Sequence, residues 1–462
     1  YATLCTSIPA VRDYLTAATA TICRKVPDLA GFFTISGSEN MTHCWSHGGG
    51  AGCPRCGQRK ASEVIAELHA ALHAGIRLAG GRQRLIAWDW GWQDAWVEDI
   101  IARLPAEVMF MSVSEWSIPI SRGGVNTEVG EYSISTVGPG PRATRHWEWA
   151  RRRGLKTLAK VQCGNTWELS AVPYIPAVAN VARHAANLSA AGVDGVMLGW
   201  TLGGYPSPNL EVMARTSPAV PTGAAERPEA SLQRVATERV GPALAPALVR
   251  AWTTLSTAFS EFPYHGGVVY NAPMQLGPAN LLWGEPTGYR ATMVGFPYDD
   301  LDGWRAVYPA EAFIGQLEKV ASGFERAHTE LAATLQKQKA QLTSDQARAA
   351  ARELTVIEAA GVHFRSTANQ ARFVRARQQL REAKTTTDRA ALGAELERLL
   401  RQEIDLARRL CGIQGRDSRI GFEASNQYYY VPVDLAEKVV NCQDLLTRWL
   451  PRAVNGEGRN AE

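Results

Sequence analysis

Five short apolar runs, separated by segments of helix length, constrain the fold of the first 212 residues more than any other feature. The runs are GFFTISG, RLIAWDW, VMFMSVS, LKTLAKVQ and GVMLGWT, at residues 31–37, 84–90, 108–114, 155–162 and 195–201. Nearly continuous apolar strands that alternate with helices are typical of parallel βα units. Gly192, which ends the last of these helical segments, is a typical C-cap before the next strand. The pattern therefore predicts a parallel sheet in an α/β region.

Each predicted strand is followed by a polar or aromatic tail, such as SEN after the first and CGNTWE after the fourth. Sites at the carboxyl ends of parallel strands are the pattern of a (β/α)₈ TIM barrel. A closed barrel needs eight strands, whereas five are visible and the chain starts at Tyr1 rather than Met. We therefore expect strands 4–8 of a TIM barrel whose N-terminal part is missing. A doubly wound open sheet is the alternative, although no Gly-rich phosphate turn follows the first strand.

The composition changes after this region. No proline or tryptophan occurs between Ala310 and Val431, where Ala, Glu, Arg, Gln and Leu dominate. Apolar residues at three- and four-residue spacing predict long helices there, arranged as antiparallel hairpins. We expect a partial TIM-barrel domain over 1–215, a helical and irregular linker that packs on the barrel over 216–305, and an all-α C-terminal domain over 306–462.

Composition excludes several classes of protein. Hydrophobic residues make up 45% of the 462 residues, which is enough for a globular core. The formal charge of +4 is too small to indicate a nucleic-acid partner. No run of ~18 apolar residues is present, so we expect no membrane span. The eight cysteines do not indicate a disulfide scaffold in a chain of this length.

Carboxylates follow four successive predicted strands. They are Glu39, Asp89, Glu115 and Glu168. Residues at the carboxyl ends of parallel strands meet at one edge of the sheet, and glycoside hydrolysis needs two carboxyl groups within about 5–10 Å of each other. A partly buried Glu39 would have the raised pKa that suits a general acid. A helix N-cap or a loop ion pair is the structural alternative for Glu39.

Tryptophans accompany these carboxylates. Ten of the 14 tryptophans precede residue 201. Indole faces stack on the C–H face of a sugar ring, while nearby polar groups bind its hydroxyls. We therefore expect a carbohydrate substrate held by Trp88, Trp90, Trp116, Asn165, Glu168, Trp200 and Tyr205, together with Asp89. Ordinary packing between sheet and helices is the alternative for the aromatic residues.

The segment HCWSHGGGAGCPRCG, residues 43–57, gathers possible metal ligands. Cys44, Cys53 and Cys56, with His43 or His47, could hold a tetrahedral zinc ion of structural type. A disulfide within the loop, or free thiols, are the alternatives. The other cysteines, including Cys5, show no partner pattern and are expected to be small buried hydrophobic residues.

With these motifs the first 212 residues resemble the family 20 glycoside hydrolases, the β-N-acetylhexosaminidase group, and the related hexosaminidase-like and α-glucuronidase-like proteins of environmental bacteria. TISGSEN resembles the Gly-Asp-Glu motif of that family, LIAWDW its fifth-strand segment and GVMLGWT its eighth-strand Trp-Thr element. The resemblance implies that Glu39 is the general acid and that Trp88 and Trp200 form walls of the sugar pocket.

One departure from the family changes the expected mechanism. The chain has Ser38 where the family has the aspartate that orients an acetamido group. A second protein carboxylate must then act as nucleophile or base, and we expect Glu115, with Glu168 next. The helical remainder is more like the α-glucuronidase group, which implies an acidic sugar that Arg290 or Arg419 could pair with.

The sequence therefore predicts a glycoside hydrolase acting on a polysaccharide or glycoconjugate, with no cofactor required for catalysis. The alternative is a non-catalytic carbohydrate-binding or scaffold protein with a degenerate barrel and partner-binding helices.

Overall fold

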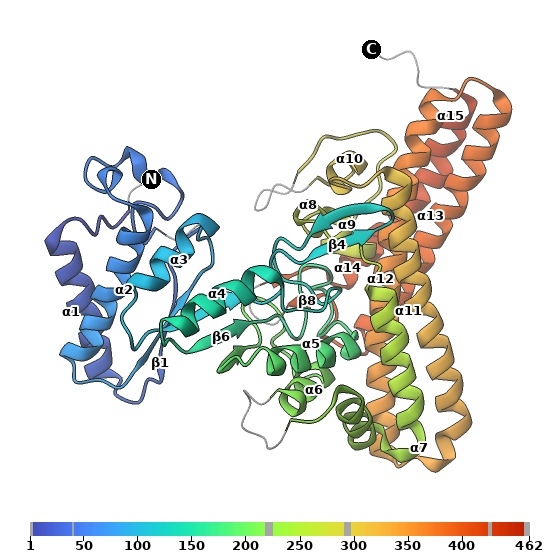
Figure 1. Cartoon of the computed structure of the whole chain (residues 1–462). Helices are drawn as coiled ribbons and strands as arrows, with labels where there is room; N and C mark the ends of the chain where they lie inside the picture. Colours follow the sequence, from blue (N-terminus) through green and yellow to red (C-terminus); the bar gives the residue numbers. More distant parts are fainter. Residues whose placement is uncertain (1–2, 39–40, 218–224, 291–296, 424–426, 457–462) are drawn as a thin grey trace. The chain divides into compact units, whose positions relative to one another are not determined.

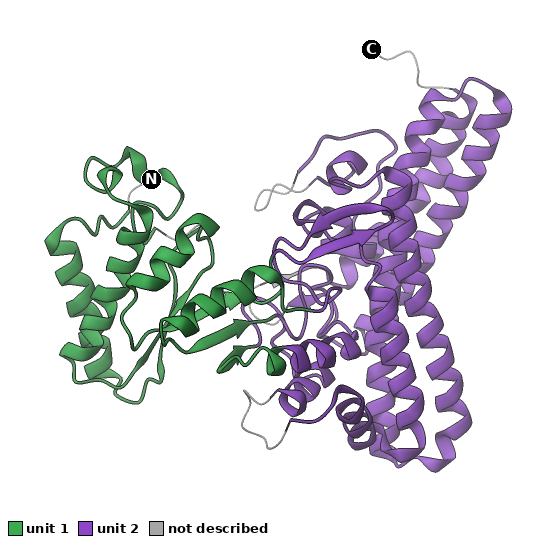
Figure 2. Cartoon of the chain, in the orientation of Figure 1, with its two compact units in different colours: residues 1–116, 138–161, 188–197 green, residues 117–137, 162–187, 198–462 purple. Residues whose placement is uncertain are grey.

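The computed structural model describes residues 3–38, 41–217, 225–290, 297–423 and 427–456. The chain forms two compact units that are interleaved along the sequence (Figure 2). Unit 1 consists of residues 1–116, 138–161 and 188–197, and unit 2 consists of residues 117–137, 162–187 and 198–462. The division into domains 1–215, 216–305 and 306–462 stays a prediction.

Unit 1 contains a parallel sheet of five strands in the order β1-β2-β3-β6-β7. The strands are β1 (Gly31–Ile35), β2 (Arg84–Trp88), β3 (Met109–Val113), β6 (Thr157–Lys160) and β7 (Gly195–Met197). All five predicted strands are confirmed, each within the apolar run that predicted it. The apolar runs identify these strands because a parallel sheet shields most of each strand from water.

The order of the strands distinguishes between the two predicted architectures. Each strand pairs with the strand before it in this sheet, and the order never reverses. A doubly wound sheet reverses its order at a switch point, whereas a barrel does not. The described residues thus form a half-barrel within a mixed α/β protein, and the complete eight-stranded barrel stays a prediction.

Helices cover one face of this sheet (Figure 1). Of these, α2 (Ala61–Leu78) and α4 (Pro141–Arg152) contact the strands, α1 (Pro9–Lys25) packs on α2, and α3 (Asp94–Arg103) packs on α2 and α4. The helix α5 (Val178–Ala190) contributes residues to both units. The hydroxyl of Thr34 in β1 lies 2.9 Å from Nε2 of His69 in α2, and Trp147 of α4 donates to the carbonyl of Leu158 in β6. Thr34 and the side chains in register with it therefore point toward the helices.

The alternate side chains form the opposite face of the sheet. Trp88 pairs with Met111 and Met111 with Leu158, so these residues share one face with Lys160. Phe33 lies on this face too, with its ring centroid 6.3 Å from that of Trp88, and is 40% exposed.

Unit 2 begins with a hairpin that sequence patterns did not predict, β4 (Pro119–Arg122) with β5 (Val125–Glu128). It then contains α6 (Pro208–Thr216), α7 (Pro228–Phe259), the short α8 (Gly266–Val269), α9 (Ala272–Leu276) and α10 (Leu301–Trp304), and the small pair β8 (Phe422–Glu423) and β9 (Gln427–Tyr428). Its long helices are α11 (Ala310–Gln338), α12 (Ser344–Glu382) and α13 (Thr386–Gln414), followed by α14 (Pro432–Asp444) and α15 (Leu450–Asn455).

The long helices confirm the prediction from the proline-free segment. Neighbouring helices α11, α12 and α13 pack against each other, and α7 packs on α11 (Figure 1). Phe259, Phe324 and Phe364 form a buried aromatic cluster where α7, α11 and α12 meet. Among the described helices, none is both long enough and apolar enough to cross a lipid bilayer.

Candidate active site and cysteine cluster

The segments that follow β1 and β2 approach each other closely. A Cβ atom added to Gly37 would lie 2.9 Å from the carbonyl oxygen of Trp90, and one added to Gly91 would lie 2.5 Å from the amide nitrogen of Ser38. Gly91 also has a φ of 74°, which favours glycine. Only residues without a side chain fit at this contact. Glu39, the predicted general acid, comes directly after Ser38 and lies outside the described residues.

Glu115 occupies the carboxyl edge of the sheet in unit 1. The amide of Ser114 donates to the carbonyl of Lys160 at 2.9 Å, so the pairing of β3 with β6 extends past Val113. Glu115 follows Ser114 in a bend, two residues beyond the end of β3. The Glu115 side chain is fully buried. A carboxylate in this position has the location expected of a catalytic group in a barrel enzyme.

Lys160 was not among the predicted site residues. It is the last residue of β6, it is fully buried, and its ammonium donates to the carbonyl of Val161 at 3.0 Å. A lysine is rarely fully buried unless its ammonium group is paired with a polar or charged group. The signal was present in the sequence, as the second of the two lysines in the apolar run LKTLAKVQ.

Three of the predicted tryptophans contact one another at this edge. The ring of Trp90 lies 5.6 Å from that of Trp88 and 5.3 Å from that of Trp116, measured between centroids. Trp88 is fully buried, whereas Trp90 and Trp116 are half-buried. The latter two therefore keep part of their ring surface accessible, which stacking on a sugar would require.

Asp89 points to the helix-covered face of the sheet and is held by protein groups. Its Oδ2 accepts hydrogen bonds from Ser112 at 2.7 Å, from Arg142 at 2.9 Å and from Nδ1 of His146 at 2.9 Å. Burial alone would raise the pKa of Asp89, but the positive charge of Arg142 and the bond from His146 outweigh it and lower the pKa. An ionised carboxylate in this position suits positioning rather than proton donation, and a role in substrate binding stays a prediction.

Arg142 connects this carboxylate to the tryptophans. Its guanidinium carbon lies 4.7 Å from the centroid of the Trp116 ring and its Nε donates to Asp94 at 2.6 Å. Arg142 and His146 lie one turn apart on α4, so both reach the same side chain. Sequence reasoning missed this pair, although the i, i+4 spacing of two polar residues on a helix that covers the sheet was visible.

Glu168 belongs to unit 2, where hydroxyl and amide groups surround it. Its carboxylate accepts hydrogen bonds from Ser133 at 2.8 Å, from the amide of Ile134 at 2.7 Å and from Thr166 at 2.7 Å, and also from the hydroxyl of Ser135. Burial raises the pKa of Glu168, against these bonds. The contacts join the loop at 133–135 to the loop at 166–168, and the role of Glu168 in catalysis or substrate binding stays a prediction.

The remaining predicted binding residues of unit 2 differ in exposure. Asn165 is buried and donates to the carbonyls of Ser170 and Val172, which shapes the loop after β6. Trp200 is 42% exposed and Tyr205 is half-buried. Of the two arginines considered for an acidic sugar, Arg419 pairs with Asp417 at 2.6 Å and Arg290 is exposed.

The predicted cysteine cluster does form, but with a fourth cysteine in place of a histidine. The Sγ atoms of Cys5, Cys44, Cys53 and Cys56 all lie within 4.8 Å of one another, a set that could hold a metal ion. The expectation that Cys5 is an isolated hydrophobic residue is therefore wrong. His43 is instead buried beside the loop, where its Nδ1 accepts from the amide of Trp45 and burial lowers its pKa to about 4.

The four thiols are not equivalent. Hydrogen bonds from the amides of Cys56 and Arg55 lower the pKa of Cys53 to about 6, whereas burial raises the pKa of Cys44 to about 12. The Cys53 sulfur is therefore the natural thiolate of the group at neutral pH, which is the form that binds metal ions.

Comparison with solved structures finds a likeness in fold to an enzyme of known type. The fold resembles that of a GH138 enzyme that targets pectin rhamnogalacturonan II, with a TM-score of 0.55 and 10% sequence identity. The alignment covers 98% of this chain and 53% of that enzyme, so the chain spans about half its length. No protein-family model and no curated protein sequence matches the chain. The likeness supports a glycoside-hydrolase-like fold, and membership of family 20 stays a prediction.

Proposed function

We propose that the chain is a glycoside hydrolase that acts on a polysaccharide, with Glu39 as general acid and Glu115 as nucleophile or base. The observation that carries the proposal is the position of Glu115, a fully buried carboxylate at the carboxyl edge of a parallel sheet, in the residue before a partly exposed tryptophan. The likeness in fold to a glycoside hydrolase supports it. Trp90 and Trp116 supply the ring surface for a sugar.

The substrate we propose is an acidic polysaccharide of the pectic type. The structurally similar enzyme targets a pectin. The long helices that follow the sheet resemble those of the α-glucuronidase group, and this resemblance favours a uronic acid in the substrate. We propose that five further residues bind the substrate: Trp88, Asn165, Glu168, Trp200 and Tyr205. Arg290 or Arg419 is the proposed partner of a substrate carboxylate.

The test is hydrolysis of pectic polysaccharides, followed as release of reducing sugar ends. The wild-type chain should release them, and Glu115→Gln should lower kcat by about 10²–10⁴, the usual contribution of a positioned carboxyl group. Glu148→Gln is the matched control, because Glu148 is an exposed glutamate of α4 in the same unit. Equal turnover by wild type and Glu115→Gln would reject the assignment of this residue.

The rival function is carbohydrate binding without catalysis. The observation in its favour is that Asp89 and Glu168, two of the four strand-end carboxylates, are bound by protein groups. This rival function predicts that the wild-type chain binds pectic polysaccharide in a pull-down assay but releases no reducing ends. It also predicts that the Glu115→Gln variant binds the polysaccharide as well as the wild type does.

A further inference from the structure

We propose that Cys5, Cys44, Cys53 and Cys56 bind one zinc ion, which fixes the segment before α1 to the loop that follows β1. The proposal is independent of the catalytic function. It rests on the spacing of the sulfur atoms, on the groups that surround them and on the chemistry of an all-sulfur site.

The spacing of the sulfur atoms matches a shared tetrahedral ion. The Sγ of Cys5 lies 3.8 Å from that of Cys53 and 3.6 Å from that of Cys56. Zinc binds thiolates at about 2.3 Å in a tetrahedron, which places the sulfurs about 3.8 Å apart. A disulfide would need about 2.05 Å. All four sulfurs meet the looser limit of 4.8 Å, so they surround one point rather than forming two pairs.

Hydrogen-bond donors surround these sulfurs. The amide of Cys56 donates to Cys53 at 3.4 Å, and the hydroxyl of Thr3 donates to Cys44 at 3.6 Å. The hydroxyl of Ser7 lies 3.2 Å from the Sγ of Cys56. Donors of this kind stabilise metal-bound thiolates and orient them.

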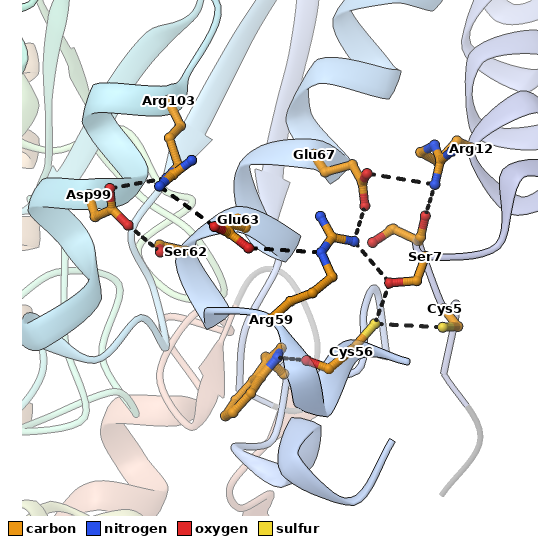
Figure 3. A network of polar contacts seen from close by, with 12 residues as sticks. Cys5, Ser7, Arg12, Cys56, Arg59, Ser62, Glu63, Glu67, Asp99 and Arg103 are labelled. Atoms are coloured by element: carbon orange, nitrogen blue, oxygen red, sulfur yellow. Dashed lines mark hydrogen bonds and ion pairs between the residues drawn. The ribbon is translucent and has the colours of Figure 1, made fainter. Parts of the chain in front are cut away.

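The side chain of Arg59 contacts Ser7, one of these hydrogen-bond donors. Arg59 donates to Ser7 at 2.9 Å and to Glu67 at 2.8 Å, as Figure 3 shows. Arg59 thereby holds in place the Ser7 hydroxyl that lies 3.2 Å from the Sγ of Cys56. The network of ion pairs continues from Arg59 through Glu63 of α2 to Arg103 of α3. Arg12 of α1 also pairs with Glu67 of α2, so three helices, α1, α2 and α3, contribute to the network beside the cysteines (Figure 3).

The ligand set selects the metal and its role. Four thiolates favour zinc or iron over hard cations such as magnesium. Four protein ligands leave no position for water or substrate, so the ion is structural rather than catalytic. Cys5 and Cys56 are 51 positions apart in the sequence. The ion would bind both of them directly and would also bind Cys44 and Cys53. The cross-linked loop runs from Cys5 to Cys56 and contains α1 and β1.

Elemental analysis of the purified full chain tests the proposal. We expect one zinc per chain, and we expect Cys5→Ser to purify with much less than one. Cys411→Ser is the matched control, since Cys411 is also half-buried but lies in α13. Iron in place of zinc would overturn the choice of metal. Metal-free protein in which all eight thiols react, or a mass lowered by two hydrogens for each disulfide, would overturn the site.

A second variant keeps the test decisive if Cys5→Ser fails to fold. Ser7→Ala removes one outer hydroxyl and should weaken zinc binding by about tenfold, the lower end of the usual effect of such partners. Competition with a chromophoric chelator measures the change. Cobalt(II) added to the chelator-stripped chain should give thiolate-to-cobalt charge-transfer absorption, and its absence would contradict thiolate ligation. Neither readout requires catalytic activity, so failure here is distinct from failure of the proposed hydrolase.

Discussion

Asp89 is a buried charge that protein groups hold in place. It is fully buried, and Arg142, which is 3% exposed, neutralises it. Removal of one partner from such a pair leaves the other charge buried and unpaired. Arg142 also contacts Trp116, so the pair positions an aromatic ring of the candidate site.

Asp89→Ala should therefore lower the free energy of unfolding by about 3–5 kcal/mol. Urea denaturation followed by tryptophan fluorescence measures the change. Asp345→Ala is the control, because Asp345 is 87% exposed and its ion pair with the exposed Arg348 is worth about 1 kcal/mol or less. Because the pKa of Asp89 is lowered in the folded chain, its stabilising effect is present at neutral pH and is lost as the pH falls below the ordinary aspartate range. A loss for Asp89→Ala no larger than for Asp345→Ala would contradict this role.

His363 gives a second prediction at this scale. It is fully buried in α12, where its Nε2 lies 2.8 Å from the carbonyl oxygen of Met274, and burial lowers its pKa to about 4. Between the ordinary histidine pKa of 6.5 and this value, the unfolded chain binds a proton that the folded chain does not. His363 is therefore neutral in both states at pH 7, and the fold loses stability relative to the unfolded chain as the pH is lowered from 6.5 to 4.

His363→Gln should remove this part of the pH dependence. Its free energy of unfolding should vary less steeply than that of the wild type between pH 6.5 and 4, by up to about 1.4 kcal/mol per pH unit. Urea denaturation at several pH values measures the slope. His73→Gln is the control, because His73 pairs with Glu107, which is 59% exposed. Identical slopes for His363→Gln and wild type would reject the assignment.

At the scale of elements, α7 contains two helical segments joined by a kink. Gly241 has φ 79° and ψ 164°, a conformation almost restricted to glycine, and Pro242 follows it. Proline fits at the start of the second segment, where no hydrogen bond from its nitrogen is needed. The sequence predicted this helix but not its kink, although the Gly-Pro pair was the signal.

Gly241→Ala should lower the free energy of unfolding by about 1–3 kcal/mol, because alanine strains the backbone at this position. The side chain of Gln346 lies where the added Cβ would go, which increases the cost. Thermal unfolding followed by circular dichroism tests this. The control is Gly315→Ala in α11, where nothing lies within 4 Å of the added atom, and alanine should be neutral or stabilising there. Equal midpoints for both variants would contradict the argument.

Elements differ in how well the sequence predicts them. The strands of the sheet were predicted because burial makes them apolar runs, and α11 to α13 because their apolar spacing is regular. The hairpin of β4 and β5 was missed because strands such as Pro119–Arg122 are short and largely polar. The contacts that define the candidate site were missed for another reason. Arg142 reaches Asp89 only through packing of α4 on the sheet, and Cys5 joins Cys44 from a distant part of the chain.

At the scale of the whole molecule, the chain combines a five-stranded half-barrel with a unit rich in long helices. Its fold resembles one glycoside hydrolase over 98% of its residues. A fold supports many chemistries, so function depends on the residues at the carboxyl edge of the sheet. The sequence has Glu39 after β1 and Glu115 after β3. We propose that these two carboxyl groups together catalyse the hydrolysis of a glycosidic bond.

The most direct test compares Glu39→Gln on two glycosides of one sugar, one with a sugar as leaving group and one with nitrophenolate. A general acid protonates the leaving group, so its loss matters only where that group is a poor one. We predict that kcat falls by about 10²–10⁴ for the sugar leaving group and changes little for nitrophenolate. Equal losses on both glycosides, or no loss on either, would contradict the central claim.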